Sequence, residues 1–229
     1  MRAVVFAGPS IEPKAVAGYP VTMLPPVARG DIDRLMSRDS PPRYIGIVDG
    51  QFLQGLMLSP KEVLRAIDTH GARVFGSSSL GALRAVELAD YGMTGVGKIF
   101  ELYRSGQIDA DDEVAITFDP DSLRPLCEPM VNIRIAVAAA VDGGVISPET
   151  ADRALAVAKS LYFPDRTYSR LIQELGARTP HDEVRRLRAF LGTRAPDAKR
   201  QDAIALLTAI QQAMEQDTTQ EGTAAARLG

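Results

Sequence analysis

The first half of the chain alternates short apolar runs with segments whose apolar residues recur every three or four positions. The short runs are residues 3–7 (AVVFA), 21–24 (VTML), 44–48 (YIGIV) and 73–75 (RVF). The segments with helical spacing are residues 28–38, 59–71 and 79–92. Short apolar runs bounded by glycine or proline are typical of buried strands, and spacing of three and four is typical of helices. Strands alternating with helices predict an α/β fold, a small parallel sheet with flanking helices.

The second half is rich in leucine and alanine and shows helical spacing only. Helices are predicted over residues 123–141, 148–162, 165–175, 181–191 and 197–216, with glycine and proline between them. The last residues are polar, small and aperiodic, which is typical of disorder. We therefore expect an α/β core over residues 1–120, an all-helical C-terminal subdomain over 121–216 and a disordered tail over 217–229.

Composition narrows the class of protein. The 229 residues carry a net charge of −3 and are 45% hydrophobic, as in soluble globular proteins. No stretch reaches the roughly 18 apolar residues of a membrane span, and no basic stripe with aromatic residues indicates nucleic-acid binding. The start, MRAVVFAG, does not have the pattern of a secretory signal. We expect a cytoplasmic protein with neither membrane nor nucleic acid as a partner.

Cysteine and histidine are scarce. With one cysteine, Cys127, and two histidines, the chain has no disulfide framework and no pattern for a Cys/His zinc site. Cys127 lies beside an apolar helical pattern, so we interpret it as a buried structural thiol. We expect no metal and no cofactor.

A helix start with a lysine in its first turn is predicted at residues 59–62, SPKE. Ser59 and Glu62 have the spacing of a capping box, with Pro60 at the first helical position. Lys61 then lies where the partial positive charge of the helix end disfavours a cation. A lysine turned inward there would favour its uncharged form and act as a base, whereas a lysine pointing to solvent would not.

Three serines in a row join the fourth apolar run to its helix, in VFGSSSLGALRAVEL (residues 74–88). In a parallel sheet, the helices that follow strands begin at the carboxyl edge, where ligands bind. Lys61, residues 77–79 and residues 8–10 (GPS) should therefore share one edge. The segment is similar to the second half of a nucleophile elbow, in which Gly81 leaves room for a close backbone approach. No histidine is placed to act as base, which leaves Lys61.

Each of these segments has alternative interpretations. The serines are also suited to helix capping, and GSSSLG to binding an anion through backbone N–H groups, although it lacks the Walker lysine. Asp49 with Gly50 is most simply a turn at a strand end, or else orients Lys61. Residues 29–31 are interpreted as a loop in which Asp31 caps the next helix. In the alternative interpretation, Arg29 holds the tail of a substrate.

Three further segments carry charge or glycine. Arg84 and Glu87 are three apart and predict an ion pair on a helix surface. Residues 92–97 (GMTGVG) predict a glycine-rich loop over the site. Residues 109–115 (DADDEVA) predict a solvated acidic loop.

Taken together, these motifs carry a family resemblance. The segments are VFAGPSI (5–11), GYP (18–20), PPVARGDI (25–32), IGIVDGQF (45–52), LSPKEVLRAI (58–67), VFGSSSLGALRAVEL (74–88), YGMTGVGKIFELYRSG (91–106) and DDEVAI (111–116). In this order they resemble the TfuA family over about residues 1–116, whereas the helical half resembles it only loosely.

The resemblance implies a role in thioamidation of peptide backbones, as in the biosynthesis of ribosomally made peptide products. It implies two protein partners: a YcaO-type enzyme, which activates the amide with ATP, and a ThiS-like ubiquitin-fold sulfur carrier, whose C-terminal thiocarboxylate yields sulfide. It also implies a hydrolase-like Ser–Lys pair acting for a precursor peptide or protein substrate. The lysine maps onto Lys61, and the serine maps onto Ser79 first and Ser78 second. Leu80 and Ser77 stand where methionine and alanine are expected in many relatives.

The implied chemistry agrees with the residues. The serine attacks the thiocarboxylate carbonyl, Lys61 takes its proton, hydrosulfide leaves, and water hydrolyses the acyl-enzyme; direct attack by water is the variant. Ser10 either donates to the oxyanion or replaces Ser79, and Asp49, Arg29 and Gly81 complete the expected substrate-binding set. Two other functions stay open: a non-catalytic adaptor that brings peptide and carrier to YcaO, and an anion- or nucleotide-binding module.

Overall fold

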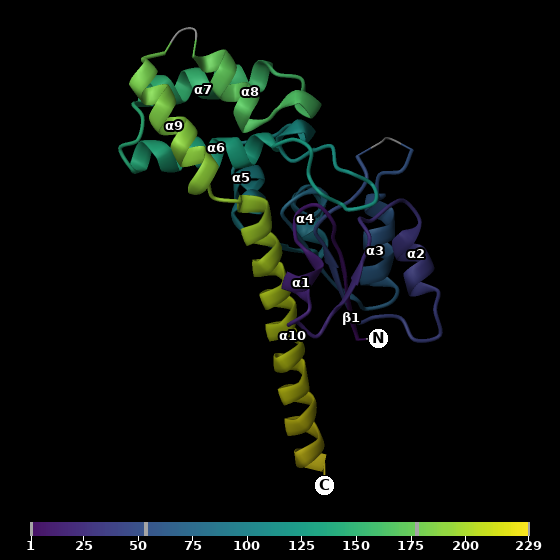
Figure 1. Cartoon of the computed structure of the whole chain (residues 1–229). Helices are drawn as coiled ribbons and strands as arrows, with labels where there is room; N and C mark the ends of the chain where they lie inside the picture. Colours follow the sequence, from purple (N-terminus) through teal and green to yellow (C-terminus); the bar gives the residue numbers. More distant parts are fainter. Residues whose placement is uncertain (1, 53–54, 177–178, 229) are drawn as a thin grey trace. The chain divides into compact units, whose positions relative to one another are not determined.

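The chain divides into two compact units. The computed structural model describes residues 2–52, 55–176 and 179–228. The sheet unit comprises Met1–Gln107 and Arg200–Gly229, and the helical unit comprises Ile108–Lys199. The division falls at residue 107 rather than at the predicted residue 120. The two units are coloured along the sequence in Figure 1.

The sheet unit is built on five parallel strands. They are β1 (Ala3–Phe6), β2 (Thr22–Leu24), β3 (Tyr44–Ile47), β4 (Arg73–Ser77) and β5 (Thr94–Val96), in the order β2-β1-β3-β4-β5. The predicted α/β fold is confirmed. The chain runs outward from β1 in both directions, so the order reverses between β1 and β3. Open parallel sheets bind ligands at such a switch point, outside the carboxyl ends of the strands.

Helices cover both faces of this sheet. They are α1 (Pro13–Val16), α2 (Asp31–Met36), α3 (Pro60–Asp68), α4 (Leu80–Leu88), the 3-10 turn η1 (Ala89–Tyr91), α5 (Lys98–Arg104) and α10 (Ala198–Leu228). Figure 1 shows α2 and α3 on one side of the strands and α10 on the other. Gly46 of β3 allows α10 to pack closely on the sheet. A Cβ at this position would lie 2.8 Å from the side chains of Leu206 and Ile210, which is too close.

Two carboxylates fasten α10 to the sheet unit. Asp202 accepts hydrogen bonds from the backbone N–H groups of Lys98 (2.8 Å) and Ile99 (2.7 Å) at the start of α5. Asp217 forms ion pairs with Arg43 (3.0 Å) and Arg73 (3.1 Å). Residues 217–228 belong to the helix α10, where a disordered tail was predicted. Residues 200–216 likewise pack on the sheet and not in the helical unit, because helical spacing shows an apolar face but not its partner.

The fifth strand was missed by the sequence pattern, which predicted a loop over residues 92–97. Phe75 of β4 pairs with Thr94, and Ser77 pairs with Val96. A Cβ on Gly95 would lie 2.2 Å from the Phe100 ring, so the ring of α5 packs directly on the strand backbone. Glycine is depleted in strands, so a three-residue strand with glycine at its centre shows no strand pattern in the sequence.

The helical unit contains α6 (Met130–Asp142), α7 (Pro148–Ser160), α8 (Tyr168–Leu175) and α9 (His181–Thr193), with the 3-10 turns η2 (Asp111–Glu113) and η3 (Phe163–Asp165). The predicted helical subdomain is present. Its first helix begins at Met130 and not at Leu123, which has a φ of +57° that no α-helix accommodates. Cys127 is buried, as expected of a structural thiol.

A cluster of paired charges holds η2 within the helical unit. Arg134 binds both carboxylate oxygens of Glu113 (2.8 and 2.9 Å), and Lys159 contacts Asp112 at 2.7 Å. Arg166, 1% exposed, contacts Asp112 at 3.1 Å. The side chain of Glu113 is 3% exposed, so the predicted solvated acidic loop is wrong for this residue.

Acid is expected to destabilise the helical unit through these carboxyls. Burial acts to raise the pKa of Glu113, but the hydrogen bonds and charges of Arg134 and Lys159 outweigh it and lower the pKa. The pKa of Asp112 is lowered in the same way by Lys159 and Arg166. A lowered pKa in the folded state gives stability that is present above the unfolded value, about 4 to 4.5. Urea unfolding at pH 7, 5 and 3 should show this stability disappearing below about pH 4.5.

The variant Glu113→Gln is the control for this prediction. It should cost about 3 kcal/mol at pH 7, because Arg134 loses its charged partner, and it should show a smaller loss between pH 5 and 3. A wild-type stability that is the same at pH 5 and pH 3 would contradict the prediction.

Among the helices that the structure describes, none has the length and apolar character to cross a bilayer. The described residues also contain no group of three or more histidine, cysteine, aspartate or glutamate side chains arranged to hold a metal ion.

Candidate functional site

The ends of three neighbouring strands bring the predicted site residues to one edge. Residues 8–10 follow β1, residues 49–50 follow β3, and residues 78–79 follow Ser77, the last residue of β4. Because β1, β3 and β4 are adjacent and parallel, their carboxyl ends lie side by side. This edge contains the switch point between β1 and β3.

The chain turns sharply at Ser78. Its φ is +66°, a left-handed backbone value that residues other than glycine rarely adopt. The N–H of Ser79 donates to the carbonyl oxygen of Ser77 at 2.8 Å, which closes a γ-turn around Ser78. A γ-turn with positive φ is rare, and strain of this kind costs on the order of 1–3 kcal/mol. Such strain persists where the surrounding structure enforces it, and it gathers at active sites.

Glycines on both sides enforce this turn. A Cβ on Gly76 would lie 2.2 Å from the carbonyl oxygen of Gly81, and a Cβ on Gly81 would lie 1.8 Å from that of Ile47. The N–H of Gly81 also donates to Val48 at 3.2 Å. The first turn of α4 is therefore in direct backbone contact with the end of β3. A serine between small residues on a strand-to-helix turn is the arrangement of a nucleophile elbow.

The hydroxyls of Ser77 and Ser78 are buried and make no hydrogen bond in the part of the chain that the structure describes. Leaving a buried hydroxyl without a partner costs about 1–3 kcal/mol. Ser79 is the N-cap residue of α4 by position, but its side chain does not cap the helix. The capping interpretation thus loses its main support. The backbone strain falls on Ser78 and not on Ser79, the first choice for the nucleophile from the family resemblance.

Lys61 lies at the start of α3, and the predicted capping box around it is confirmed. Ser59 Oγ accepts from the N–H of Lys61 at 3.3 Å, and the N–H of Ser59 donates to Glu62 at 3.4 Å. The Lys61 residue is exposed, and within the described residues its ammonium group has no hydrogen bond or ion pair. The structure therefore does not bring Lys61 into hydrogen bonding with Ser77 or Ser78.

Asp49 organises the loop after β1. Its buried carboxylate accepts from the N–H groups of Gly8 (2.8 Å) and Ser10 (3.0 Å) and from Ser10 Oγ (2.6 Å). The alternative interpretation, in which Asp49 orients Lys61, finds no hydrogen bond between these two described residues to support it. Asp49 instead joins the loops after β1 and β3 across the switch point, and it holds the Ser10 hydroxyl as a donor.

Replacing Asp49 with alanine is expected to destabilise the sheet unit by about 3–5 kcal/mol, because it leaves two buried N–H groups and one hydroxyl without an acceptor. Ser10→Ala removes one of these bonds and should cost about 1 kcal/mol. Urea unfolding of both variants measures the difference. Equal stabilities would show that the carboxylate does not hold the loop.

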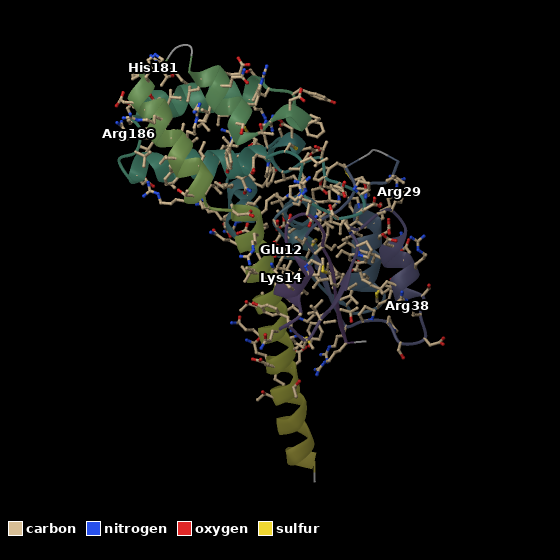
Figure 2. The ribbon with its side chains drawn as sticks, viewed as in Figure 1. Glu12, Lys14, Arg29, Arg38, His181 and Arg186 are labelled. Carbon is tan, nitrogen blue, oxygen red and sulfur yellow. The ribbon has the colours of Figure 1, made fainter. Side chains whose placement is uncertain are left out.

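Arg29 lies at the rim of this edge. It is exposed, and its N–H donates to Leu56 at 2.8 Å. Figure 2 shows Arg29 and Arg38 at opposite ends of α2. The N-cap of α2 is Gly30, with φ +85°, and not Asp31 as predicted. The N–H of Gly30 donates to Glu62 at 2.8 Å, so Glu62 joins the Arg29 loop to the helix of Lys61.

Arg84 is buried where a helix surface is predicted. Arg84 forms the predicted pair with Glu87, at 2.7 Å, but Arg84 is 7% exposed and not on the surface. Its Nε donates to the carbonyl oxygen of Leu58 at 3.0 Å, just before the capping box of α3. Spacing of three on a helix predicts the ion pair but gives no signal for a contact with a distant segment.

A family comparison covers most of these residues. The model of the family described as TfuA-like protein matches residues 49–167, more than half of the chain. The chain belongs to the TfuA family. A search of curated proteins found no match.

The TfuA match includes Asp49, Lys61, Arg84 and the serine triplet, and it continues into the helical unit, which the sequence motifs covered only loosely. Ser10 and Arg29 lie before the matched region. Their place in the site depends on geometry: Ser10 on its bond to Asp49, and Arg29 on its position at the start of α2.

Proposed function

We propose that the protein hydrolyses the thiocarboxylated C-terminus of a ThiS-like, ubiquitin-fold sulfur carrier and releases sulfide for YcaO-dependent thioamidation. Family membership supports the thioamidation context. The observation that supports catalysis is the strained turn that carries the buried, unpartnered hydroxyl of Ser78 at the ligand-binding edge of the sheet. The precursor peptide or protein would receive the sulfur from the YcaO enzyme, in the cytoplasm.

In this proposal Ser78 is the nucleophile, with Ser79 as the alternative. The hydroxyl oxygen attacks the carbonyl carbon of the thiocarboxylate, and Lys61 in its uncharged form accepts the hydroxyl proton. The C–S bond then breaks, and the proton leaves with sulfur as hydrosulfide. Water attacks the resulting ester, which gives the carboxylate and restores the serine. The reaction consumes one water and needs no cofactor.

The surrounding groups have supporting roles in this proposal. The start of α4 carries the partial positive charge of the helix end next to the serine turn, and in this proposal it stabilises the negative charge that develops on the carbonyl oxygen. Ser10 stays fixed by Asp49 at the switch point, where its loop borders the substrate. Arg29, exposed at the rim, is suited to holding the tail of the carrier.

The exposed position of Lys61 requires that its side chain turn inward when the substrate binds. The four-carbon stem is flexible, and catalytic contacts commonly tighten only in the substrate complex. The same observation favours the second candidate function, a non-catalytic adaptor that brings the carrier and the peptide to YcaO. An exposed lysine is suited to contacting a partner surface, and an adaptor needs no Ser–Lys contact.

One assay separates the two functions. The thiocarboxylated carrier is incubated with the wild-type protein, with Lys61→Met and with Ser78→Ala, and the carrier is followed by intact mass while released sulfide is measured. Hydrolysis replaces sulfur by oxygen in the carrier mass. Loss of turnover in both variants, with carrier binding retained, supports the hydrolase. Turnover that is unchanged in both, or absent in the wild-type protein with YcaO present, supports the adaptor.

A further inference from the structure

Arg84 joins the two helix starts that the proposed reaction needs. It lies in α4, the helix that follows Ser78, and its Nε donates at 3.0 Å to Leu58, the residue before the cap of α3. The residue is 7% exposed, and its second contact is the half-exposed carboxylate of Glu87. A buried cation therefore connects the serine helix to the lysine helix.

Neither helix needs this contact in order to begin. The start of α3 is closed by its own capping box, and the start of α4 is fixed by backbone packing of Gly81 against β3. The bond from Arg84 to Leu58 instead connects α4 to the segment that leads into α3. Burying a guanidinium is costly, and an apolar side chain of similar volume would commonly fill the space at lower cost. The charged group is thus better explained by the contact it makes than by packing.

We infer that Arg84 is a positioning residue, which holds the start of α3 at the distance from which Lys61 reaches Ser78 once substrate is bound. This inference rests on the proposed function. Glu62 supports it from the other side, since its buried carboxylate fixes the same helix start to Gly30. A displacement of about 1 Å between reacting groups lowers rates by about 100-fold.

The test compares Arg84→Met and Arg84→Lys with a matched control, Arg65→Met. Arg65 also connects α3 to a neighbouring helix, through its contact with Asp33 of α2 at 3.1 Å, but it is exposed. With the thiocarboxylated carrier as substrate, Arg84→Met should lower kcat by about 100-fold and leave KM unchanged. Arg84→Lys, which keeps a charged donor, should recover part of kcat. Arg65→Met should stay within about twofold of wild type.

Thermal unfolding followed by circular dichroism identifies a temperature at which all variants are folded, and the rates are measured at that temperature. A kcat of Arg84→Met within about threefold of wild type, with Lys61→Met inactive, overturns the inference and leaves the proposed function intact. If Arg84→Met does not fold, Arg84→Lys decides, and a wild-type kcat in that variant overturns the inference. Full turnover in Lys61→Met and Ser78→Ala overturns the proposed function and the inference with it.

Discussion

Replacing Ser78 with alanine is expected to lower hydrolysis of the thiocarboxylated carrier by a factor on the order of 10³ or more, as losing a catalytic serine commonly does. Ser79→Ala should lower it by less than about tenfold. The difference follows from the backbone, because only Ser78 lies at the centre of the γ-turn. Intact-mass measurements of the carrier over time give both rates.

The stability of the same position gives a second readout that does not depend on the substrate. Ser78→Gly should raise the free energy of unfolding by about 1 kcal/mol, because glycine adopts a φ of +66° without strain and removes an unpartnered buried hydroxyl. A stabilised but inactive variant would show that serine at this position lowers stability and is needed for the reaction. An active Ser78→Ala together with an inactive Ser79→Ala would transfer the nucleophile to Ser79.

Replacing Gly81 with alanine is expected to destabilise the sheet unit by about 3 kcal/mol or more, in the upper range for single substitutions. The new Cβ would lie 1.8 Å from the carbonyl oxygen of Ile47, and because that oxygen is a backbone atom of β3, the clash cannot be relieved by rotating a side chain. Urea unfolding followed by circular dichroism measures the loss. The turn at Ser78 depends on the same contact, so residual folded protein should also have lowered activity.

The matched control is Gly192→Ala. Gly192 lies in α9, and a Cβ there would meet nothing within 4 Å. Alanine is favoured over glycine in helices by about 1 kcal/mol, so this variant should be neutral or stabilising. Equal effects of the two substitutions would contradict the backbone contact inferred for Gly81.

The strands and most of the helices could be predicted from local spacing, because burial on a sheet face or a helix stripe leaves a periodic trace. Residues 44–48 and the capping box at Ser59 are examples in which local signals were strong. The long-range assignments could not be predicted in this way. The side chains of Leu206 and Ile210 pack against β3 because Gly46 has no side chain there. The sequence around residue 206 gives no local signal that its partner is residue 46.

The candidate site also combines features that the sequence predicts with long-range contacts that it does not. Topology rules alone predict that the serines, Ser10 and Lys61 lie at one edge of the sheet. The strain at Ser78 and the bond from Arg84 to Leu58 depend on angles and distances that residue types do not encode. Asp49 accepts hydrogen bonds from Gly8 and Ser10, which lie about 40 residues before it in the chain, and local sequence patterns give no signal for such a contact.

The position of α10 in the chain has a consequence for biosynthesis. The helical unit is one continuous stretch, Ile108–Lys199, whereas the sheet unit needs Arg200 onward to cover its open face. Ribosomes add about 5–20 residues per second, so the covering helix arrives about a second or more after the last residue of the helical unit. The helical unit, although it comes later in the sequence, should thus be synthesised in full before the sheet unit, which is completed only after residues 200–228 have been added.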